Sequence, residues 1–325
     1  MKSRLFKLIC IAGLVMAAVS CAEDKDESSD SIQKRILEAY EKIHYPQGLT
    51  TTENGTKIIS MNEGVGNYIE RYNVVYLYMT TMDLDGNYIS TNKEEVARQL
   101  GSYSKSTHYA PKLNILGAGS MITGLEELLY SMKRDSKVVA IIPPWASNYE
   151  YSKKSFANST NLIYKVEVAN VVTDINEYQN NRLSKYSATY YDAIDSTAAG
   201  FYFKTLDAAL QNDTIARNES LNVRYVGKLL DGFVFDTNIR DSAKAYGIYD
   251  SSKSYDALSI TYNEDYSSLK ENNSVVSGFA KAITQMKRHG ERAVTFFSSD
   301  WGYTSQGSGD NIDAYEPLFF YLYIE

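Results

Sequence analysis

The 325-residue sequence is poor in the residues that build disulfide or metal frameworks, with two cysteines, three histidines and five prolines. Both cysteines, Cys10 and Cys21, lie near the N-terminus, so the rest of the chain has no thiol for a disulfide or a zinc site. The histidines, His44, His108 and His289, are far apart in the sequence and suggest no metal set. We therefore expect no metal or cofactor. Stability must come from packed cores, and about 300 residues suffice for two of them.

The chain also lacks an excess of positive charge. Its 33 Lys and Arg residues against 40 Asp and Glu residues give a net charge of −7. A negative chain without a basic patch disfavours a nucleic-acid partner. Tyrosine, in contrast, is frequent, with 28 residues. Exposed tyrosine suits binding surfaces, although burial in sheets is its more common use.

The N-terminus is predicted to be a secretory signal. Three basic residues within the first seven precede a short apolar run, Leu8–Val19, which is too short to span a bilayer comfortably. The four residues that end at Cys21, Ala-Val-Ser-Cys, resemble a bacterial lipobox. This resemblance implies a lipoprotein signal over residues 1–21, with Cys21 lipidated as the first residue of the mature chain. An ordinary signal peptide with a stray cysteine is the alternative.

Residues 22–30 are mostly Asp, Glu, Ser and Lys. Such a run cannot bury apolar surface and predicts a flexible acidic tether. It also resembles the export tag of surface lipoproteins in the Bacteroidota. We therefore expect a lipid anchor at the cell envelope, in the outer membrane, and the sequence leaves open whether the protein faces the periplasm or the outside.

A repeat organises the remaining chain. The segment Gly124–Arg134 returns as Gly278–Arg288, with the Gly, the Leu or Ile and the Met-Lys-Arg at identical offsets. The separation from Gly124 to Gly278 is 154 residues, which is the size of a domain. We predict two copies of one module, an N-terminal copy over residues 31–173 and a C-terminal copy over residues 174–325. Each copy should begin with a helix.

Within each copy, strand-like segments surround a Gly-bearing turn and the repeated helix. Asp85-Gly86 and Asp231-Gly232 lie between apolar runs, a pattern typical of β-hairpins. The repeated segments carry one apolar stripe at helical spacing and end in Lys-Arg, where cations suit the helix dipole. One short helix among many strands favours an α+β fold in which a curved antiparallel sheet wraps around that helix.

The C-terminal copy carries a further pattern of motifs in a fixed order. These are Val223–Gly227, Asp231–Asp236, Val275–Phe279, Met286-Lys287, Gly290-Glu291, Asp300–Tyr303, Ile312 and Leu318–Phe320. As a set they resemble FKBP-type peptidyl-prolyl cis-trans isomerases, over about residues 199–325 and more weakly over 56–172. The resemblance implies two tandem FKBP-like domains, each a half-barrel curled around its helix with an apolar cup between them.

The resemblance also implies the residues of the C-terminal cup. Phe279 would form its floor, where the family usually has Trp, Tyr303 would donate a hydrogen bond to a ligand carbonyl, and Asp236 would position polar groups at the rim. The expected catalytic residues are Phe235, Asp236, Tyr303 and Phe320, and the expected substrate-binding residues are Tyr225, Val275, Val276, Phe279 and Ile312. A plain sheet core is the alternative explanation for these aromatic residues. An insertion at about 237–274, and Asp313 where Pro is usual, leave the substrate preference open.

The chemistry of this family explains why no catalytic triad or metal is needed. Rotation about an X-Pro bond passes through a twisted amide, with an uncatalysed barrier of about 18–20 kcal/mol. A dry aromatic cup with a few fixed donors can favour that less solvated amide without breaking a bond.

The N-terminal copy has lost much of this pattern. Met79 stands for Tyr225, Ile89 for Phe235, Ser90 for Asp236 and Leu125 for Phe279, and no tyrosine near residues 143–147 matches Tyr303, whereas Met121, Ile122 and Tyr164 keep apolar positions. We predict that this copy is an inactive structural or binding module.

The sequence therefore predicts a membrane-anchored isomerase that acts through its C-terminal copy on X-Pro bonds of exported, proline-containing polypeptides. The main alternative is a non-catalytic binding or chaperone module at the envelope. A glycan-binding accessory lipoprotein rests only on export and tyrosine content. The oligomeric state remains open.

Overall fold

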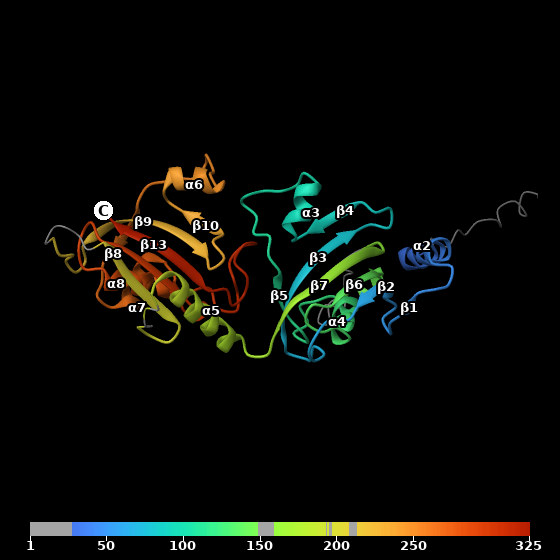
Figure 1. Ribbon diagram of the computed structural model, residues 1–325. Helices are drawn as coiled ribbons and strands as arrows, with labels where there is room; N and C mark the ends of the chain where they lie inside the picture. Colours follow the sequence, from blue (N-terminus) through green and yellow to red (C-terminus); the bar gives the residue numbers. More distant parts are fainter. Residues whose placement is uncertain (1–27, 149–158, 193, 195–196, 208–212) are drawn as a thin grey trace, which may run out of the picture.

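The computed structural model describes residues 28–325 except for 149–158, 193, 195–196 and 208–212. Two bodies of antiparallel strands and short helices follow one another along the chain, with α2 at the outer end of the first body (Figure 1). The predicted signal, Cys21 and residues 22–27 of the acidic tether lie outside the described residues. The last three residues expected in the flexible tether, 28–30, instead begin α2, with Ser28 as its N-cap. No helix in the described part of the chain is both long and apolar enough to cross a membrane.

The N-terminal copy contains one seven-stranded sheet in the order β1-β2-β6-β7-β3-β4, with β5 also paired to β3. Its strands are β1 (Thr50–Thr51), β2 (Lys57–Asn62), β3 (Val74–Met82), β4 (Tyr88–Thr91), β5 (Lys112–Ile115), β6 (Lys137–Ile142) and β7 (Leu162–Val172). Its helices are α2 (Ser29–His44), α3 (Glu94–Gln99), α4 (Thr123–Tyr130) and the 3-10 turn η1 (Pro144–Ala146).

The C-terminal copy repeats this topology in a sheet of order β10-β9-β13-β12-β8, with β11 also paired to β9. Its strands are β8 (Phe201–Asp207), β9 (Ser220–Leu229), β10 (Val234–Thr237), β11 (Leu258–Thr261), β12 (Arg292–Phe297) and β13 (Leu318–Ile324). Its helices are α5 (Ile175–Tyr190), α6 (Arg240–Tyr246), α7 (Tyr266–Asn273), α8 (Ser277–Gln285) and η2 (Ser299–Trp301). Every strand pairing in both sheets is antiparallel, which confirms the predicted α+β fold class.

The repeated glycine lets α4 and α8 lie close against their sheets. A Cβ on Gly278 would come within 2.5 Å of the Phe297 ring, and a Cβ on Gly124 within 2.9 Å of the Ile142 side chain. Phe297 and Ile142 are the last residues of the equivalent strands β12 and β6. A larger side chain at either glycine would push the helix off the sheet, because protein interiors leave no spare volume.

The other repeated apolar positions are buried in the two cores. The two methionines lie just past the ends of α4 and α8, so the Lys-Arg that follows each lies beyond the last helical turn rather than in it as expected. Leu129 and Met132 in the N-terminal copy, and Ile283 and Met286 in the C-terminal copy, are at most 1% exposed. Each such side chain stabilises its core by about 1.5–3 kcal/mol relative to exposure. The sequence repeat is therefore a repeat of helix-on-sheet packing.

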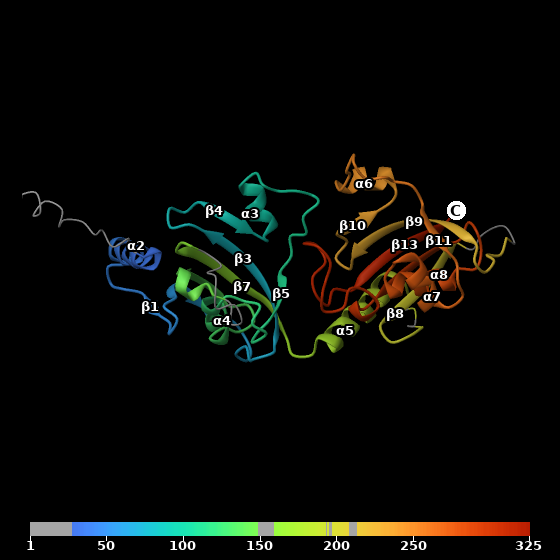
Figure 2. The ribbon, with the colours of Figure 1, turned by 180° about the vertical axis from the view of Figure 1, so that it is seen from behind.

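The predicted insertion, residues 237–274, contains α6, β11 and α7. Most of it has a counterpart in the N-terminal copy, because the connection from β4 to β5 (residues 92–111) and that from β10 to β11 (residues 238–257) have the same length. The additional residues lie between β11 and α8, where α7 lies beside α8 (Figure 2). The structure thus assigns the extra length of the C-terminal copy mainly to α7.

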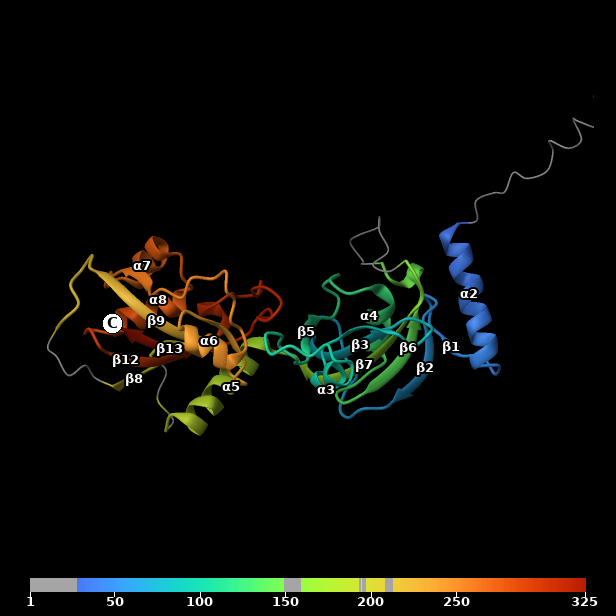
Figure 3. The same cartoon turned by 90° about the horizontal axis from the view of Figure 1, so that it is seen from above.

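The two copies are joined through β7 and α5. Seen from above, β5 and α5 lie where the two bodies meet (Figure 3). The ring of Tyr76 on β3 lies 5.6 Å from that of Tyr178 on α5, inside a small apolar cluster with Val74 and Val172. This cluster gives the linker region its own buried contacts.

Candidate functional site

A cavity of about 330 Å³ opens in the C-terminal copy between the sheet and the start of α8. It is lined by Tyr225, Phe235, Asp236, Leu258, Lys270, Ser274, Val275, Val276, Ser277, Phe279, Gly302, Tyr303 and Phe320. We call this cavity the cup. Eight of the nine cup residues expected from the sequence line it together. The ninth, Ile312, is buried in the neighbouring core with an exposed fraction of 6% and is not part of the lining.

A larger cavity, of about 610 Å³, lies elsewhere on the C-terminal copy. Its walls include Arg224 and Tyr323, which are strand positions offset by an odd number of residues from Tyr225 and Phe320. Successive side chains of a strand point to opposite faces, so this cavity lies across the sheet from the cup. Its wall combines three arginines and two aspartates with Tyr255 and Tyr323. None of the residues expected in the site lines it, so we place the candidate site in the cup.

Gly227 makes room for the aromatic walls of the cup. It pairs with Phe320 on β13 and with Asp236 on β10, at the centre of the β10-β9-β13 ladder. A Cβ at this position would lie 2.7 Å from the Phe235 ring and 2.9 Å from the Phe320 ring. The absence of a side chain at Gly227 therefore allows both rings to cover the strand from above.

The aromatic rings of the cup meet edge to face. Phe279 and Phe320 have ring centroids 5.3 Å apart at 87°, and Tyr225 and Phe279 lie 5.8 Å apart at the same angle. Phe235 contacts Phe320 in the same way, at 5.7 Å and 85°. Edge-to-face pairs are the preferred geometry of aromatic rings. Phe279 and Phe320 are 4% and 5% exposed, so they form a rigid, dry floor and wall.

Asp236 is held at the rim by several donors. The Tyr225 hydroxyl donates to Asp236 Oδ2 at 2.6 Å, and the Thr237 N–H donates to Oδ1 at 2.9 Å. The ammonium group of Lys253 pairs with the same carboxylate. Burial and the hydrogen bond to Asp236 raise the pKa of Tyr225 well above its usual value, so Tyr225 stays protonated. Lys253 could not be predicted from the sequence, because only the fold brings it back across 17 residues to Asp236.

Tyr303 and the start of α8 supply unused donors. In the described part of the chain, the Tyr303 hydroxyl has no hydrogen-bond partner, whereas that of Tyr225 is occupied by Asp236. Val275 and Val276 lead into α8, which has no side-chain cap, and Val276 and Ser277 line the cup. The first N–H groups of a helix have no partner within it. The cup therefore offers donors for a carbonyl oxygen above an apolar floor.

The strand register shows how the N-terminal copy differs. Thr81 in the N-terminal copy is equivalent to Gly227 in the C-terminal copy. Thr81 pairs with Tyr164 on β7 and with Ser90 on β4. Gly227 pairs in the same way with Phe320 on β13 and with Asp236 on β10. This register places Met79 at the position of Tyr225, Ile89 at that of Phe235 and Ser90 at that of Asp236. The Thr81 hydroxyl forms a hydrogen bond with that of Ser90 at 2.7 Å, where the C-terminal copy has two aromatic rings.

The tyrosine donor also has no counterpart among the described residues of the N-terminal copy. Counted from the equivalent 3-10 turns η1 and η2, Asn148 holds the position of Tyr303. The segment that follows, 149–158, lies outside the described residues. The N-terminal copy thus keeps the sheet and the helix but has neither the tyrosine nor the carboxylate at these positions.

Comparison with known proteins identifies the family. The model of the FKBP-type peptidyl-prolyl cis-trans isomerase family matches residues 73–169 and 211–324, one segment in each copy. The chain therefore belongs to the FKBP-type peptidyl-prolyl cis-trans isomerase family. No curated protein sequence matches it.

Several solved structures are similar to this chain. The three FKBP domains of wheat FKBP73 are 15% identical, with a TM-score of 0.30 and coverage of 83% of this chain and 92% of that one. A peptidyl-prolyl cis-trans isomerase from Pseudomonas syringae is 24% identical, with a TM-score of 0.31 and coverage of 46% and 92%. FkpA from Escherichia coli is 18% identical, with a TM-score of 0.32 and coverage of 53% and 72%.

Proposed function

We propose that the C-terminal cup catalyses cis–trans isomerisation of X-Pro bonds in exported proteins. The observation that carries the proposal is the convergence of Tyr225, Asp236, Phe279, Tyr303 and Phe320 on one cavity, within a chain of this family. The volume of about 330 Å³ lies in the range of small-ligand sites and has room for a prolyl ring.

In this proposal the cup binds proline and stabilises its amide in the twisted form. Phe279 and Phe320 exclude water from the prolyl ring. A twisted amide loses less hydration free energy than a planar one when it leaves water, so a dry cup favours the twisted form. The Tyr303 hydroxyl donates to the carbonyl oxygen of a neighbouring residue and so fixes the chain about which rotation occurs. The carboxylate of Asp236 orients Tyr225 and keeps it protonated. No nucleophile is needed because no bond breaks.

We further propose that the protein works at the cell envelope, anchored through a lipid on Cys21. The support for this part is the lipobox-like sequence before Cys21 and the acidic tether after it. Several acyl chains on one residue give firm anchoring where one chain is marginal. Labelling of whole cells with a radioactive fatty acid should mark the wild-type protein and not Cys21→Ala, and labelling of both proteins would contradict the assignment.

The central experiment is isomerisation of a Leu-Pro or Phe-Pro peptide by soluble residues 22–325. Tyr303→Phe should lower kcat/KM about tenfold, the effect of one lost neutral hydrogen bond of about 1.4 kcal/mol. Asp236→Ala should lower it at least as much, because Tyr225 and Lys253 lose their shared partner. Ser90→Ala is the matched control at the equivalent position and should leave the rate unchanged. A folded wild-type protein that gives only the spontaneous rate would rule out the enzyme.

A non-catalytic binding module is the second candidate. Phe279 at the cup floor, where the family usually has Trp, favours it. Under this alternative, both copies would bind unfolded polypeptides whether or not these contain proline. Binding of a proline-free unfolded chain by wild-type protein and by Tyr303→Phe alike, without isomerisation, would support the binding module over the enzyme.

A further inference from the structure

The loop over residues 304–316 directly follows a cup residue in the chain, although none of its own residues lines the cavity. It leaves η2 directly after Tyr303, a cup residue, and leads to β13. Its neck is closed, because the Tyr315 N–H donates to the Thr304 carbonyl at 2.8 Å. The Ser308–Ile312 bridge joins the two arms of the loop again further out, so the loop is a compact unit. A restraint on its outer part therefore also restrains Tyr303.

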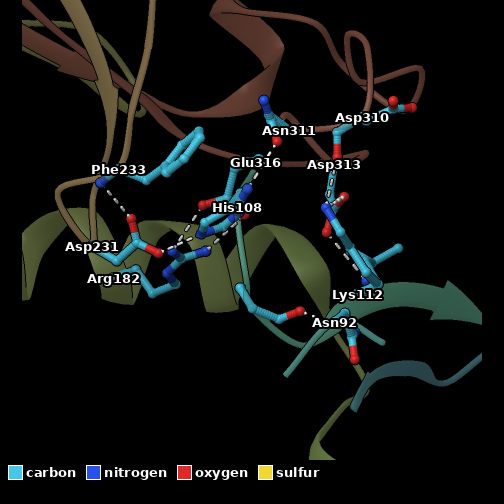
Figure 4. Close-up of polar contacts among 12 residues, drawn as sticks. Asn92, His108, Lys112, Arg182, Asp231, Phe233, Asp310, Asn311, Asp313 and Glu316 are labelled. Carbon is cyan, nitrogen blue, oxygen red and sulfur yellow. Dashed lines mark hydrogen bonds and ion pairs between the residues drawn. The ribbon is translucent and has the colours of Figure 1, made fainter. Parts of the chain in front are cut away.

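The outer part of this loop is bound by the N-terminal copy. Asn311 accepts a hydrogen bond from the His108 N–H at 2.9 Å and donates one to the Ser106 carbonyl at 2.9 Å. Figure 4 shows Asn311 directed at His108 across the two copies. Two opposed bonds from one carboxamide fix both the position and the direction of the segment they hold.

A second contact lies next to the first. Lys112 on β5 donates to Asp313 Oδ1 at 3.0 Å and to the Asp310 carbonyl at 2.8 Å (Figure 4). The Asp313 side chain is 21% exposed and that of Lys112 is 31% exposed, so water screens the pair only in part. Asp313 is the residue that departs from the proline usual in the family. The residue that replaces the usual proline therefore forms an ion pair with Lys112 of the N-terminal copy.

The hairpin beside the loop is held as well. The His108 ring lies 4.8 Å from that of Phe233, and its Nε2 is 2.7 Å from Asp231 Oδ2. Burial alone would raise the pKa of Asp231, but the hydrogen bonds from His108 and the Phe233 N–H hold it below its usual value. At the other end of the loop, Arg182 on α5 binds Glu316 at 3.0 Å. The loop and the hairpin are therefore fixed from several directions.

The connection between β4 and β5 and the equivalent connection between β10 and β11 contact different parts of the molecule. In the C-terminal copy, residues 238–257 turn back and bring Lys253 to the rim carboxylate, Asp236. In the N-terminal copy, residues 92–111 instead carry Ser106 and His108 across to the other copy. The N-terminal copy has no carboxylate at its own rim position, and its connection instead contacts the loop that follows the C-terminal cup.

We propose that the N-terminal copy is a positioning module for the C-terminal cup: through Ser106, His108 and Lys112 it fixes the loop 304–316 and thereby Tyr303. This proposal deepens the proposed isomerase function and rests on it only for its effect on catalysis. A loop that is ordered before the client arrives does not have to be ordered by binding, so the cup binds proline peptides more tightly. Ser106, His108 and Lys112 are positioning residues and do not contact the client.

The test is a charge exchange in the full soluble chain, residues 22–325. Lys112→Asp and Asp313→Lys should each speed amide hydrogen exchange across 304–316 about fivefold and raise the KM for a Leu-Pro peptide about fivefold, with kcat nearly unchanged. The double variant, Lys112→Asp with Asp313→Lys, should restore most of both values, because the ion pair returns although the bond to the Asp310 carbonyl does not; a merely structural defect would not be restored. Lys185→Asp, an exposed lysine on α5, is the charge-matched control and should change neither.

A second variant, Asn311→Ala, removes the carboxamide without changing charge and should give the same two effects if either reversed-charge variant fails to fold. Unchanged exchange in folded Lys112→Asp and Asn311→Ala would overturn the proposal. Faster exchange with an unchanged KM would also overturn it, because the loop would then not position the cup. The wild type could show no isomerisation while amide hydrogen exchange across 304–316 is faster in the single variants and slower again in the double variant. In that case the enzyme proposal fails and the coupling between the copies is upheld.

Discussion

The two copies share one sheet order and one helix, yet only the C-terminal copy combines a glycine at the centre of its ladder with two covering phenylalanines. At that position the N-terminal copy has Thr81, whose side chain bonds to Ser90. In the C-terminal copy, Gly227 leaves its space to Phe235 and Phe320. A few substitutions on one face of a sheet can therefore create or remove a binding cavity while the packing of helix on sheet is retained.

The largest effect should come from truncating the equivalent helix residues Phe279 and Leu125, both 4% exposed. Phe279→Ala should destabilise the C-terminal copy by about 3–5 kcal/mol and Leu125→Ala the N-terminal copy by about 2–5 kcal/mol, because each leaves a cavity. Only Phe279→Ala should also abolish isomerisation. The sequence has two tryptophans, Trp145 and Trp301, one in each copy.

Each copy can therefore be followed separately by urea unfolding in single-tryptophan backgrounds. Trp145→Phe leaves Trp301 as the probe of the C-terminal copy, and Trp301→Phe leaves Trp145 as the probe of the N-terminal copy. An equal shift of both transitions by Phe279→Ala would show that the copies do not unfold independently.

A smaller effect should follow from making the C-terminal ladder like the N-terminal one. Gly227→Thr should overpack the cup at a cost of about 1–3 kcal/mol and lower kcat/KM at least tenfold, because Phe235 and Phe320 must move. The reciprocal change, Thr81→Gly, should cost about 1 kcal/mol through backbone entropy and leave isomerisation unchanged. Full activity in a folded Gly227→Thr protein would disprove the role assigned to Gly227.

The copies should also differ in how their stability depends on pH. The Glu325 carbonyl and the Glu219 carboxylate raise the pKa of His289, whereas the N-terminal copy has Asp135 after the repeated Arg134. A raised pKa means that the folded state binds the proton more tightly. The stabilisation is therefore complete below about pH 6.5, the ordinary histidine value, and is lost as the pH rises through the pKa of the folded protein.

The Trp301 melting temperature should accordingly fall between about pH 6 and pH 8 by more in the wild type than in His289→Gln. The Trp145 transition is the internal control. An identical pH dependence of both proteins at Trp301 would show that His289 contributes nothing.

The smallest effect concerns the rim. Lys270 on α7 lines the cup, is exposed and forms no ion pair among the described residues, and the N-terminal copy has no helix equivalent to α7. Lys270→Glu should shift the preference between Glu-flanked and Lys-flanked proline peptides by about two- to threefold, since an exposed pair contributes less than about 1 kcal/mol. The shift should vanish in about 1 M salt. Lys185→Glu on α5 should cause no shift, and a shift of the same size would point to net charge alone.

Much of the fold could be predicted from the sequence. The repeat around Gly124 and Gly278 identified the helix and its buried face, because periodic burial leaves a local pattern in the chain. The helices expected at the start of the two copies are α2 and α5. The hairpin turns at Gly86 and Gly232 follow from local chemistry in the same way, since both have positive φ angles.

The site could be predicted only in part. The family resemblance named eight of the residues that line the cup, among them Asp236 and Tyr303. It also named Ile312, which lies in the core rather than in the lining, within a loop that the N-terminal copy holds. Lys253 and Lys270 were not foreseen, because an exposed lysine in a polar segment carries no local sign of its partner.

The sequence by itself therefore determined the duplication, the two cores and the aromatic and acidic residues of one cup. The duplication and the cores follow from periodicity and spacing, which are local features of the chain, whereas the residues of the cup follow from the resemblance to the FKBP family. The tertiary structure alone decided that Lys253 meets Asp236, that α7 supplies most of the extra length of the C-terminal copy and that Asn311 and Asp313 meet the N-terminal copy. These contacts join residues up to about 200 positions apart, and only the packing of whole sheets and the path of their connections brings such residues together.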